Sequence, residues 1–270
     1  IHRIFLLQII NGKEYLDNYT LRIQKERITS GTRGSIFDRE GKLLAYNELS
    51  YSVTIEDNGV YDSTRQKNKL MNKELNTVIH MIESKGDTIT NNFGIQKVNK
   101  GMYDFNVSGK ALKRFLADIY GHKKIDELKY NKKLGYNEGA ATPTQVMEYL
   151  QNKFAIYVEG RDDKEKVEED RDYYTEEEAY KIMILRYAIS QNSYQKYVLT
   201  TIAQNVSDET VAVIKENSEI LQGIDITEDS IRKYVDSEYF AHIIGYTGKI
   251  SKTEYDELSK EDDSYTLNDV

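Results

Sequence analysis

The stretch 33-RGSIFDREGKLLA-45 decides how this chain folds, because it sets turn-forming residues between two runs of extended character. Asp38 can begin a type I turn through Arg39 and Glu40, and Gly41 supplies the residue most tolerant of positive φ. We therefore predict a strand, a turn and a second strand. We also predict that Asp38 accepts backbone N–H bonds within the turn, which makes the hairpin a brace rather than a catalytic turn.

Arginines in this stretch have two interpretations. Arg33 and Asp38 could bind a ligand, or the arginines could pair with nearby carboxylates and carbonyls and connect chain segments. We favour the second interpretation, since a half-buried guanidinium is a good connector between segments.

Further extended segments lie on both sides of the chain's middle. The β-branched run Tyr51–Asp57 predicts a strand, as do Tyr197–Ala203 and the sequence LQGIDITED from residue 221 onward. A strand with one apolar face is marginal alone in water. We therefore expect Arg33–Asp57 and Tyr197–Ser251 to pair with each other across the intervening chain.

The middle of the chain reads mostly as helix. Apolar residues at helical spacing occur at Leu70, Leu75, Val78, Ile79 and Ile82. Three more helices are predicted after the capping residues Ser108, Thr142 and Thr175, the last forming a capping box with Glu178.

Two shorter helices and a charged loop complete the elements expected along the chain. The helices are Asp208–Asn217 with Ser207 as cap and Val211 and Ile214 inward, and one opening at Ser251. The charge run Glu159–Asp172 predicts a solvated loop.

These elements predict an α+β fold in two parts. Residues 1–57 and 188–270 would form a β-rich pedestal built from both chain ends, and residues 58–187 an inserted, mostly helical head subdomain.

The first residue is Ile1, and the apolar run IHRIFLLQII contains His2, Arg3 and Gln8. It is shorter than the roughly 20 residues that span a membrane. We expect the sequence to be a fragment trimmed at both ends.

Composition argues against several classes of protein and site. The net charge of −8 disfavours nucleic-acid binding, which needs a basic face. The chain has no Cys, so disulfides and thiolate metal sites are excluded. His2, His80, His122 and His242 form no ligand pair at helical spacing, and GYTGK at 245–249 is too short for a phosphate loop. We expect neither a metal nor a cofactor.

A serine acyl enzyme of the penicillin-recognising type would need S-x-x-K, S-x-N and K-[ST]-G motifs. The first pattern occurs at Ser193–Lys196 and at Ser230–Lys233, about as often as chance predicts for this composition. The single S-x-N begins at Ser190, ahead of Ser193, and K-[ST]-G is absent. We therefore predict that neither serine is a nucleophile and that no catalytic residue lies in this sequence.

Two segments resemble class B penicillin-binding proteins. The stretch from residue 33 is similar to the family signature R-G-x-I-x-D-R-x-G-x-x-L-A. The stretch IRKYVDSEYFAHIIGYTGKIS at 231–251 is similar to a second family segment, with Val235 where the family usually has proline. The matching residues expected to act as a structural motif are Arg33, Gly34, Asp38, Arg39, Gly41, Arg232, Tyr234, His242, Gly245, Tyr246 and Gly248.

The resemblance implies a non-catalytic pedestal, or dimerisation domain, of a membrane-anchored serine D,D-transpeptidase that cross-links peptidoglycan. It implies that this domain lies outside the cytoplasmic membrane. It also implies that an N-terminal helix, removed from this sequence, anchors the protein in the membrane. Implied partners are the protein's own transpeptidase domain, a polytopic membrane glycosyltransferase, other divisome or elongasome proteins, and a second copy of the chain.

Two other classes of function stay open. One is a free-standing extracytoplasmic protein that binds glycan or peptide in a groove lined by some of the 22 tyrosines. The other is an enzyme in its own right, which no motif supports. The continuation of the gene past Val270 separates the pedestal from the binding protein, and covalent labelling by penicillin tests for the enzyme.

Overall fold

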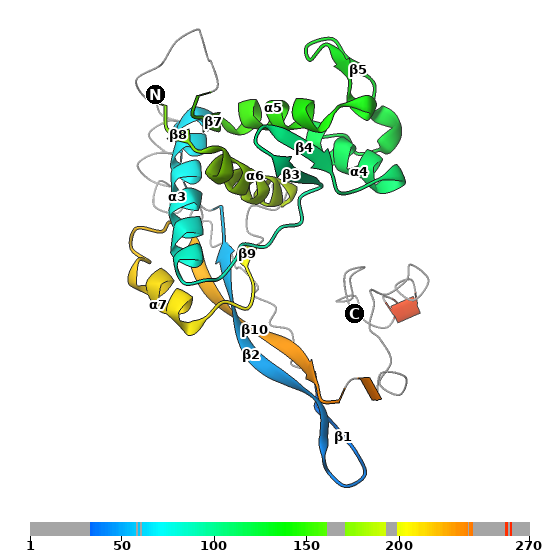
Figure 1. Cartoon of the computed structure of the whole chain (residues 1–270), viewed down its shortest axis with the longest axis vertical. Coiled ribbons are helices and arrows are strands. Elements are labelled where there is room, and N and C mark those ends of the chain that lie inside the picture. Colours follow the sequence, from blue (N-terminus) through cyan, green and yellow to red (C-terminus); the bar gives the residue numbers. More distant parts are fainter. Residues whose placement is uncertain are drawn as a thin grey trace, which may run out of the picture. The chain divides into compact units, whose positions relative to one another are not determined.

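The computed structural model describes residues 33–57, 59, 61–160, 171–192, 199–236, 238–239, 257–258 and 260. The chain divides into two compact units, Ile1–Gly34 and Ser35–Val270. The elements below all belong to the second unit (Figure 1).

A four-stranded antiparallel sheet brings together strands from residues 36–55 and from residues 200–234. It contains β1 (Ile36–Phe37), β2 (Leu43–Ile55), β9 (Thr200–Ala203) and β10 (Ile224–Tyr234), in the order β1–β2–β10 with β9 also paired to β2. β2 and β10 run together from the pair Ile55–Ile224 to the pair Ala45–Tyr234, as the blue and orange ribbons in Figure 1 show. The predicted pairing of the two distant segments is confirmed for the described residues.

The two strands are longer than the sequence patterns predicted. Residues 43–45 and 51–55 belong to the single strand β2, and β10 continues past LQGIDITED to Tyr234. No glycine or proline interrupts 43–55, so nothing local ends the strand. The two strands pair at eleven consecutive positions, and every second pair exchanges backbone hydrogen bonds, so both remain extended through their polar central residues.

Five α-helices occur in the described part of the chain: α3 (Thr64–Ser84), α4 (Gly109–Tyr120), α5 (Pro143–Phe154), α6 (Glu176–Gln191) and α7 (Asp208–Glu216). The capping predictions at Thr142, Thr175 and Ser207 are confirmed, since each side chain accepts a bond from a backbone N–H of the first turn. Ser108 stands at the start of α4 as predicted, but its side chain makes no capping bond. The predicted last helix, after Ser251, lies almost wholly outside the described residues.

The middle of the chain also contains short strands that the helical pattern did not predict. They form the hairpins β3 (Ile95–Asn99) with β4 (Met102–Phe105) and β5 (Tyr130–Asn131) with β6 (Tyr136–Asn137), and the parallel pair β7 (Tyr157–Val158) with β8 (Tyr173–Tyr174). Short 3₁₀ turns lie at Ile125–Glu127 and Glu138–Ala140. The fold is therefore α+β, as expected, with three small sheets among the helices.

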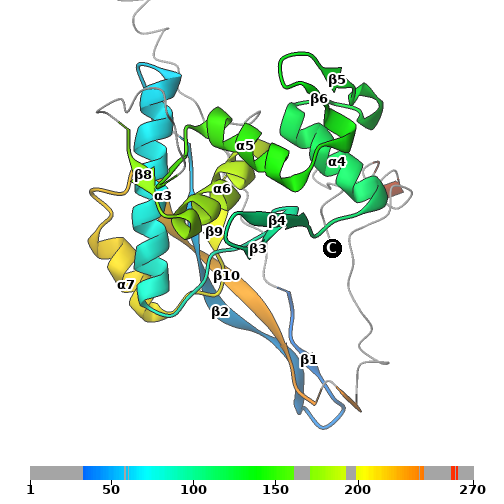
Figure 2. The ribbon, with the colours of Figure 1, turned by 45° about the horizontal axis from the view of Figure 1, so that its top comes forward.

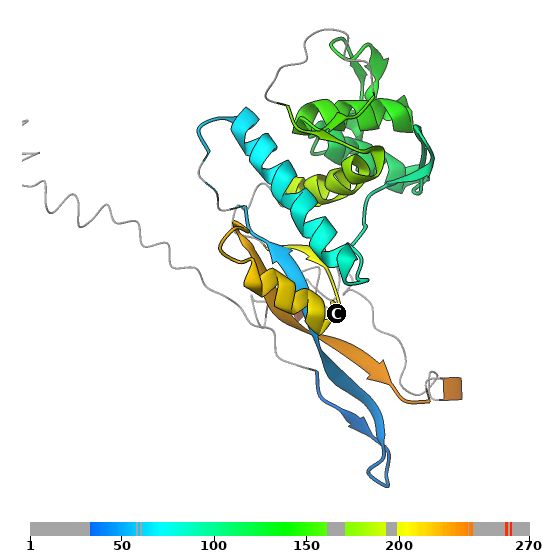
Figure 3. The same ribbon diagram turned by 60° about the vertical axis from the view of Figure 1, so that its left-hand side comes forward.

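One hydrophobic core runs from the sheet into the helices. It includes Val53 and Ile55 of β2, Ile202 of β9 and Ile79 of α3. Figure 2 shows α3, α5 and α6 gathered together, and Figure 3 shows α7 lying along β2 and β10. The sheet and the helices share this core, so core packing does not mark where a pedestal would end and a head would begin. The predicted boundary between pedestal and head stays a prediction.

Leu70 is an exception to the predicted apolar stripe of α3, since it is 47% exposed. Met71, Leu75 and Ile79 are buried at spacings of four residues, which places them on one side of the helix. Leu70 precedes Met71 by one position and therefore points about 100° away. Leu70 therefore does not belong to the buried side of the helix, although it was counted with the apolar residues at helical spacing.

Within the residues that the structure describes, no helix combines the length and apolar character needed to cross a membrane.

Candidate functional site

The hairpin between β1 and β2 is closed by Asp38 and Gly41. The backbone N–H of Gly41 donates to the carbonyl of Asp38 at 3.1 Å, and the N–H of Asp38 donates to the carbonyl of Lys42 at 2.9 Å. The Oδ1 of Asp38 accepts from the N–H groups of Glu40 and Lys42, both at 2.8 Å. Gly41 has φ +82°, which disfavours any side chain. The predicted role of Asp38 as an acceptor of backbone N–H bonds is confirmed.

The arginines of the first motif lie at the surface. Arg39 is 4.0 Å from the carboxylate of Glu40, and their side chains are 92% and 77% exposed. Such an exposed pair contributes little stability. Arg33 and Gly34 are also exposed, and each makes at least one interaction.

The second motif meets the first across the sheet. Arg232 lies opposite Asn47, and its Nη1 donates to the Oδ1 of Asn47 at 3.0 Å. Tyr234 lies opposite Ala45, and Ala45 also faces Ile36 of β1. The structure thus brings together the two segments singled out from the sequence. The remaining motif residues His242, Gly245, Tyr246 and Gly248 lie outside the described residues.

One face of this ribbon carries both buried and exposed apolar side chains. Alternate residues of a strand share a face, and directly paired residues do too. Ala45, Val53, Ile55 and Ile224 on this face are buried, whereas Leu49 is 61%, Tyr234 42% and Ile36 37% exposed. We call Ile36, Leu49 and Tyr234 the ribbon face. These three residues stand on three different strands, so only the pairing of the strands places them on one face.

Ser230 lacks the geometry of a penicillin-reactive serine. In that chemistry the lysine sits one helical turn after the serine and faces it. Ser230 and Lys233 lie three positions apart on the strand β10, so their side chains point to opposite faces. Lys233 instead pairs with Glu48 at 3.3 Å. Ser193 lies outside the described residues.

The two described histidines each contact a carboxylate. His80 Nε2 lies 2.8 Å from Glu178, and His122 Nε2 lies 2.7 Å from the buried Glu138. Burial by itself raises the pKa of Glu138, but hydrogen bonds from Asn131 and His122 outweigh it and hold that pKa below its ordinary value. Across the described ranges, no three metal-type ligands converge.

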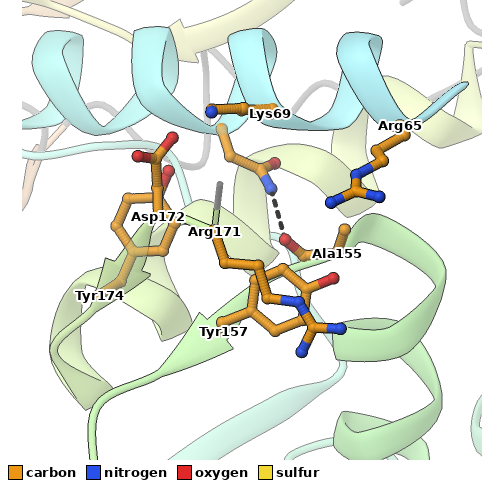
Figure 4. A pocket seen from close by; sticks show the side chains of 8 residues that line it. Arg65, Lys69, Ala155, Tyr157, Arg171, Asp172 and Tyr174 are labelled. Atoms are coloured by element: carbon orange, nitrogen blue, oxygen red, sulfur yellow. Dashed lines mark hydrogen bonds between the residues drawn. The ribbon is translucent and has the colours of Figure 1, made fainter. Parts of the chain in front are cut away.

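A small pocket lies between the start of α3 and the β7–β8 pair (Figure 4). Arg65 and Lys69 of α3 line it together with Tyr157 and Arg171, and the guanidinium of Arg171 is 4.5 Å from the ring centre of Tyr157. Its volume of about 30 Å³ holds little more than a water molecule. We assign it no ligand.

Comparison with known proteins gives one family match and several structural neighbours. The family described as "Penicillin-binding Protein dimerisation domain" matches residues 28–270. Among solved structures, penicillin-binding protein 2B from Streptococcus pneumoniae strain 5204 aligns with 20% identity and a TM-score of 0.40, covering 89% of this chain and 32% of that one. The same protein from strain R6 aligns with 21% identity and a TM-score of 0.37, covering 89% and 31%.

The chain thus spans about a third of the length of these structural neighbours. A search of curated proteins found no significant match. The family match covers most of the sequence and includes both motifs that meet in the sheet. This chain belongs to the penicillin-binding protein dimerisation domain family.

Proposed function

We propose that this chain is the non-catalytic, extracytoplasmic pedestal of a membrane-anchored penicillin-binding protein. The transpeptidase domain, a serine D,D-transpeptidase, would belong to the same polypeptide. The observation that carries the proposal is the family match over residues 28–270. The motif residues would then act structurally, and residues 58–187 would form a head inserted into the pedestal.

The long ribbon suits a supporting role. β2 has 13 residues, which corresponds to about 40 Å at the usual rise of a strand. It is paired without interruption to β10 over eleven positions. Backbone hydrogen bonds along the whole pair resist bending, so the ribbon can hold an attached domain at a defined distance.

The ribbon face suits a partner. Ile36, Leu49 and Tyr234 are exposed apolar residues on the face of the sheet that also holds the buried Val53 and Ile55, and the polar pair Asn47–Arg232 lies between Leu49 and Tyr234. Exposed apolar residues on such a face are typical of interaction surfaces. We assign this surface to the transpeptidase domain, a polytopic membrane glycosyltransferase of the divisome or elongasome, or a second copy of the chain.

Labelling with a fluorescent penicillin tests the assignment of catalysis. We expect no covalent labelling of the 270-residue chain. We expect labelling of the full-length protein encoded by its gene, at a serine in a downstream S-x-x-K motif accompanied by S-x-N and K-[ST]-G. Labelling of this chain at Ser193 or Ser230, or a gene without those downstream motifs, would contradict the proposal.

Substitution on the ribbon face tests the partner surface. The double variant Leu49→Ser, Tyr234→Ser should weaken association at least about tenfold, since two central apolar contacts are lost. Association is measured by light scattering for the chain itself and by pull-down for the glycosyltransferase. Leu70→Ser on α3 is the matched control, because it also removes an exposed leucine. Equal association by the control and the double variant would rule out this surface.

A further inference from the structure

A second feature of the structure, independent of the pedestal role, is a cleft of about 800 Å³ among α3, α4, α5 and α6. Figure 2 labels these four helices. The volume falls in the range typical of sites for small ligands. Its lining holds the cations Lys67, Arg114, Lys123, Lys153 and Arg186 against the two carboxylates Asp57 and Asp118. A positive cleft in a chain of net charge −8 points to an anionic ligand.

Both carboxylates in the cleft are already paired. Asp57 contacts the ammonium of Lys67, and Asp118 contacts the guanidinium of Arg114. Neither carboxylate lies within ion-pair distance of Arg186 or Lys153, although the nearby charge of Asp57 acts to raise the pKa of Arg186. Three cations of the cleft, Lys123, Lys153 and Arg186, therefore have no carboxylate within ion-pair distance in the described part of the chain.

Arg186 is buried, with 6% of its surface exposed, whereas Lys123 and Lys153 are exposed. Its Nη2 donates to the Oδ1 of Asn68, and its guanidinium lies 4.9 Å from the ring centre of Phe154. Its Nε and Nη1 have no hydrogen-bond partner among the described residues. A buried, charged donor without a partner is costly, which favours an acceptor that enters from the cleft.

Lys153 lies against the same aromatic ring. Its Nζ is 5.6 Å from the ring centre of Phe154 and donates to the carbonyl of Ile119 at 3.3 Å. Burial lowers the pKa of Lys153, and burial lowers the pKa of Arg186 to about 10. A bound anion would stabilise the charged forms of Lys153 and Arg186, which burial disfavours.

We propose that this cleft binds a small ligand that carries an oxyanion, either a carboxylate or a phosphate, at Arg186 and Lys153. The unpartnered donors of Arg186 would bind the oxygens, and Lys153 would neutralise the remaining charge. Met71, Phe154 and Ile189 give the cleft an apolar wall for the rest of the ligand.

Titration of the 270-residue chain with inorganic phosphate and, separately, with succinate tests this proposal. Chloride holds the ionic strength constant. The readouts are the melting temperature and the Nε–Hε resonance of Arg186 in a proton–nitrogen NMR spectrum. We expect at least one of the two anions to give a saturable shift in both, and the one that binds distinguishes phosphate from carboxylate.

Variants localise the site. Arg186→Gln and Lys153→Met should each weaken binding at least about tenfold, because each removes one cation from the oxyanion. Arg39→Gln is the control, since it makes the same substitution at an exposed arginine of the hairpin and should bind as the wild type does.

Two results would overturn the proposal. One is that neither anion shifts the Arg186 resonance saturably in the wild-type chain. The other is that Lys153→Met binds with wild-type affinity. Both remain decisive if Arg186→Gln fails to fold.

Discussion

At the scale of single residues, the hairpin depends on one carboxylate and one glycine. Asp38 holds two backbone N–H groups of the turn, and Gly41 adopts the positive φ that returns the chain into β2. The charged neighbours Arg39 and Glu40 make only an exposed pair with each other. The conspicuous charges of the motif therefore differ in role, and Asp38 is the one that shapes the turn.

Asp38→Ala should lower the free energy of unfolding by about 1 kcal/mol, since two N–H groups exchange a fixed acceptor for water. For a chain of this size that corresponds to a fall in melting temperature of about 2–4 °C. Hydrogen exchange at the amides of Glu40 and Lys42 should accelerate as well.

Asp38→Asn is the conservative partner of this variant, because it keeps an acceptor oxygen and should lose less stability. Glu40→Ala is the control and should stay within about 0.5 kcal/mol of the wild type. If Asp38→Ala matched Glu40→Ala in both stability and amide exchange, the brace would be refuted.

At the scale of elements, carboxylates at helix starts connect segments that are distant in sequence. Glu178 accepts from the N–H and hydroxyl of Thr175 at 2.8 and 2.7 Å, which closes the capping box of α6. It also contacts His80 of α3 at 2.8 Å. Asp87, which follows α3, accepts from the N–H of Ser207 and the hydroxyls of Ser207 and Thr210 at the start of α7. Glu178 and Asp87 thus bind groups at the start of one helix and also connect that helix to α3 or to the residues that follow α3.

The capping box of α6 should make stability depend on pH. Hydrogen bonds from Thr175, first among several, lower the pKa of Glu178 to about 2 from an ordinary value of 4.5. The folded state therefore favours the ionised carboxylate. Its stabilising effect is complete above about pH 4.5 and is lost as the pH falls toward 2.

Urea unfolding of the wild type and Glu178→Gln between pH 2 and 7 measures this effect. We expect the variant to be less stable by about 2 kcal/mol at pH 7, and the difference to disappear near pH 2. A double-mutant cycle with Thr175→Ala provides the control, because the coupling between the two residues should vanish over the same interval. A coupling that does not change with pH would contradict the assigned bonds.

At the scale of the whole molecule, the sheet and the helices share one core. Ile79 of α3 is 1% exposed and belongs to the same cluster as Val53 of β2 and Ile202 of β9. The proposed division into pedestal and head therefore need not coincide with separate unfolding units.

Ile79→Ala should cost about 2–5 kcal/mol, since it leaves a cavity in this shared core. Hydrogen exchange is the measurement, and the amides of β2, β10 and α6 should all lose protection together. Leu70→Ala on the exposed side of α3 is the control and should cost less than about 0.5 kcal/mol. Full protection of β2 and β10 alongside exposed helices would instead mean that pedestal and head unfold separately.

The sequence by itself determined the turn at Asp38–Gly41 and the starts of α5, α6 and α7. These features rest on contacts between residues within four positions of one another, so a short window contains their whole cause. The resemblance of two segments to one family was likewise readable from the chain.

The tertiary structure decided the features that depend on residues far apart in the chain. The pairing of β2 with β10 runs without interruption through polar central residues. Those residues show no alternation of apolar and polar side chains, so neither segment alone predicts a strand there, and each is extended because the other pairs with it. The exposure of Leu49 and Leu70 and the burial of Arg186 depend on which elements cover them. Burial is a property of packing between segments, and no local pattern contains it.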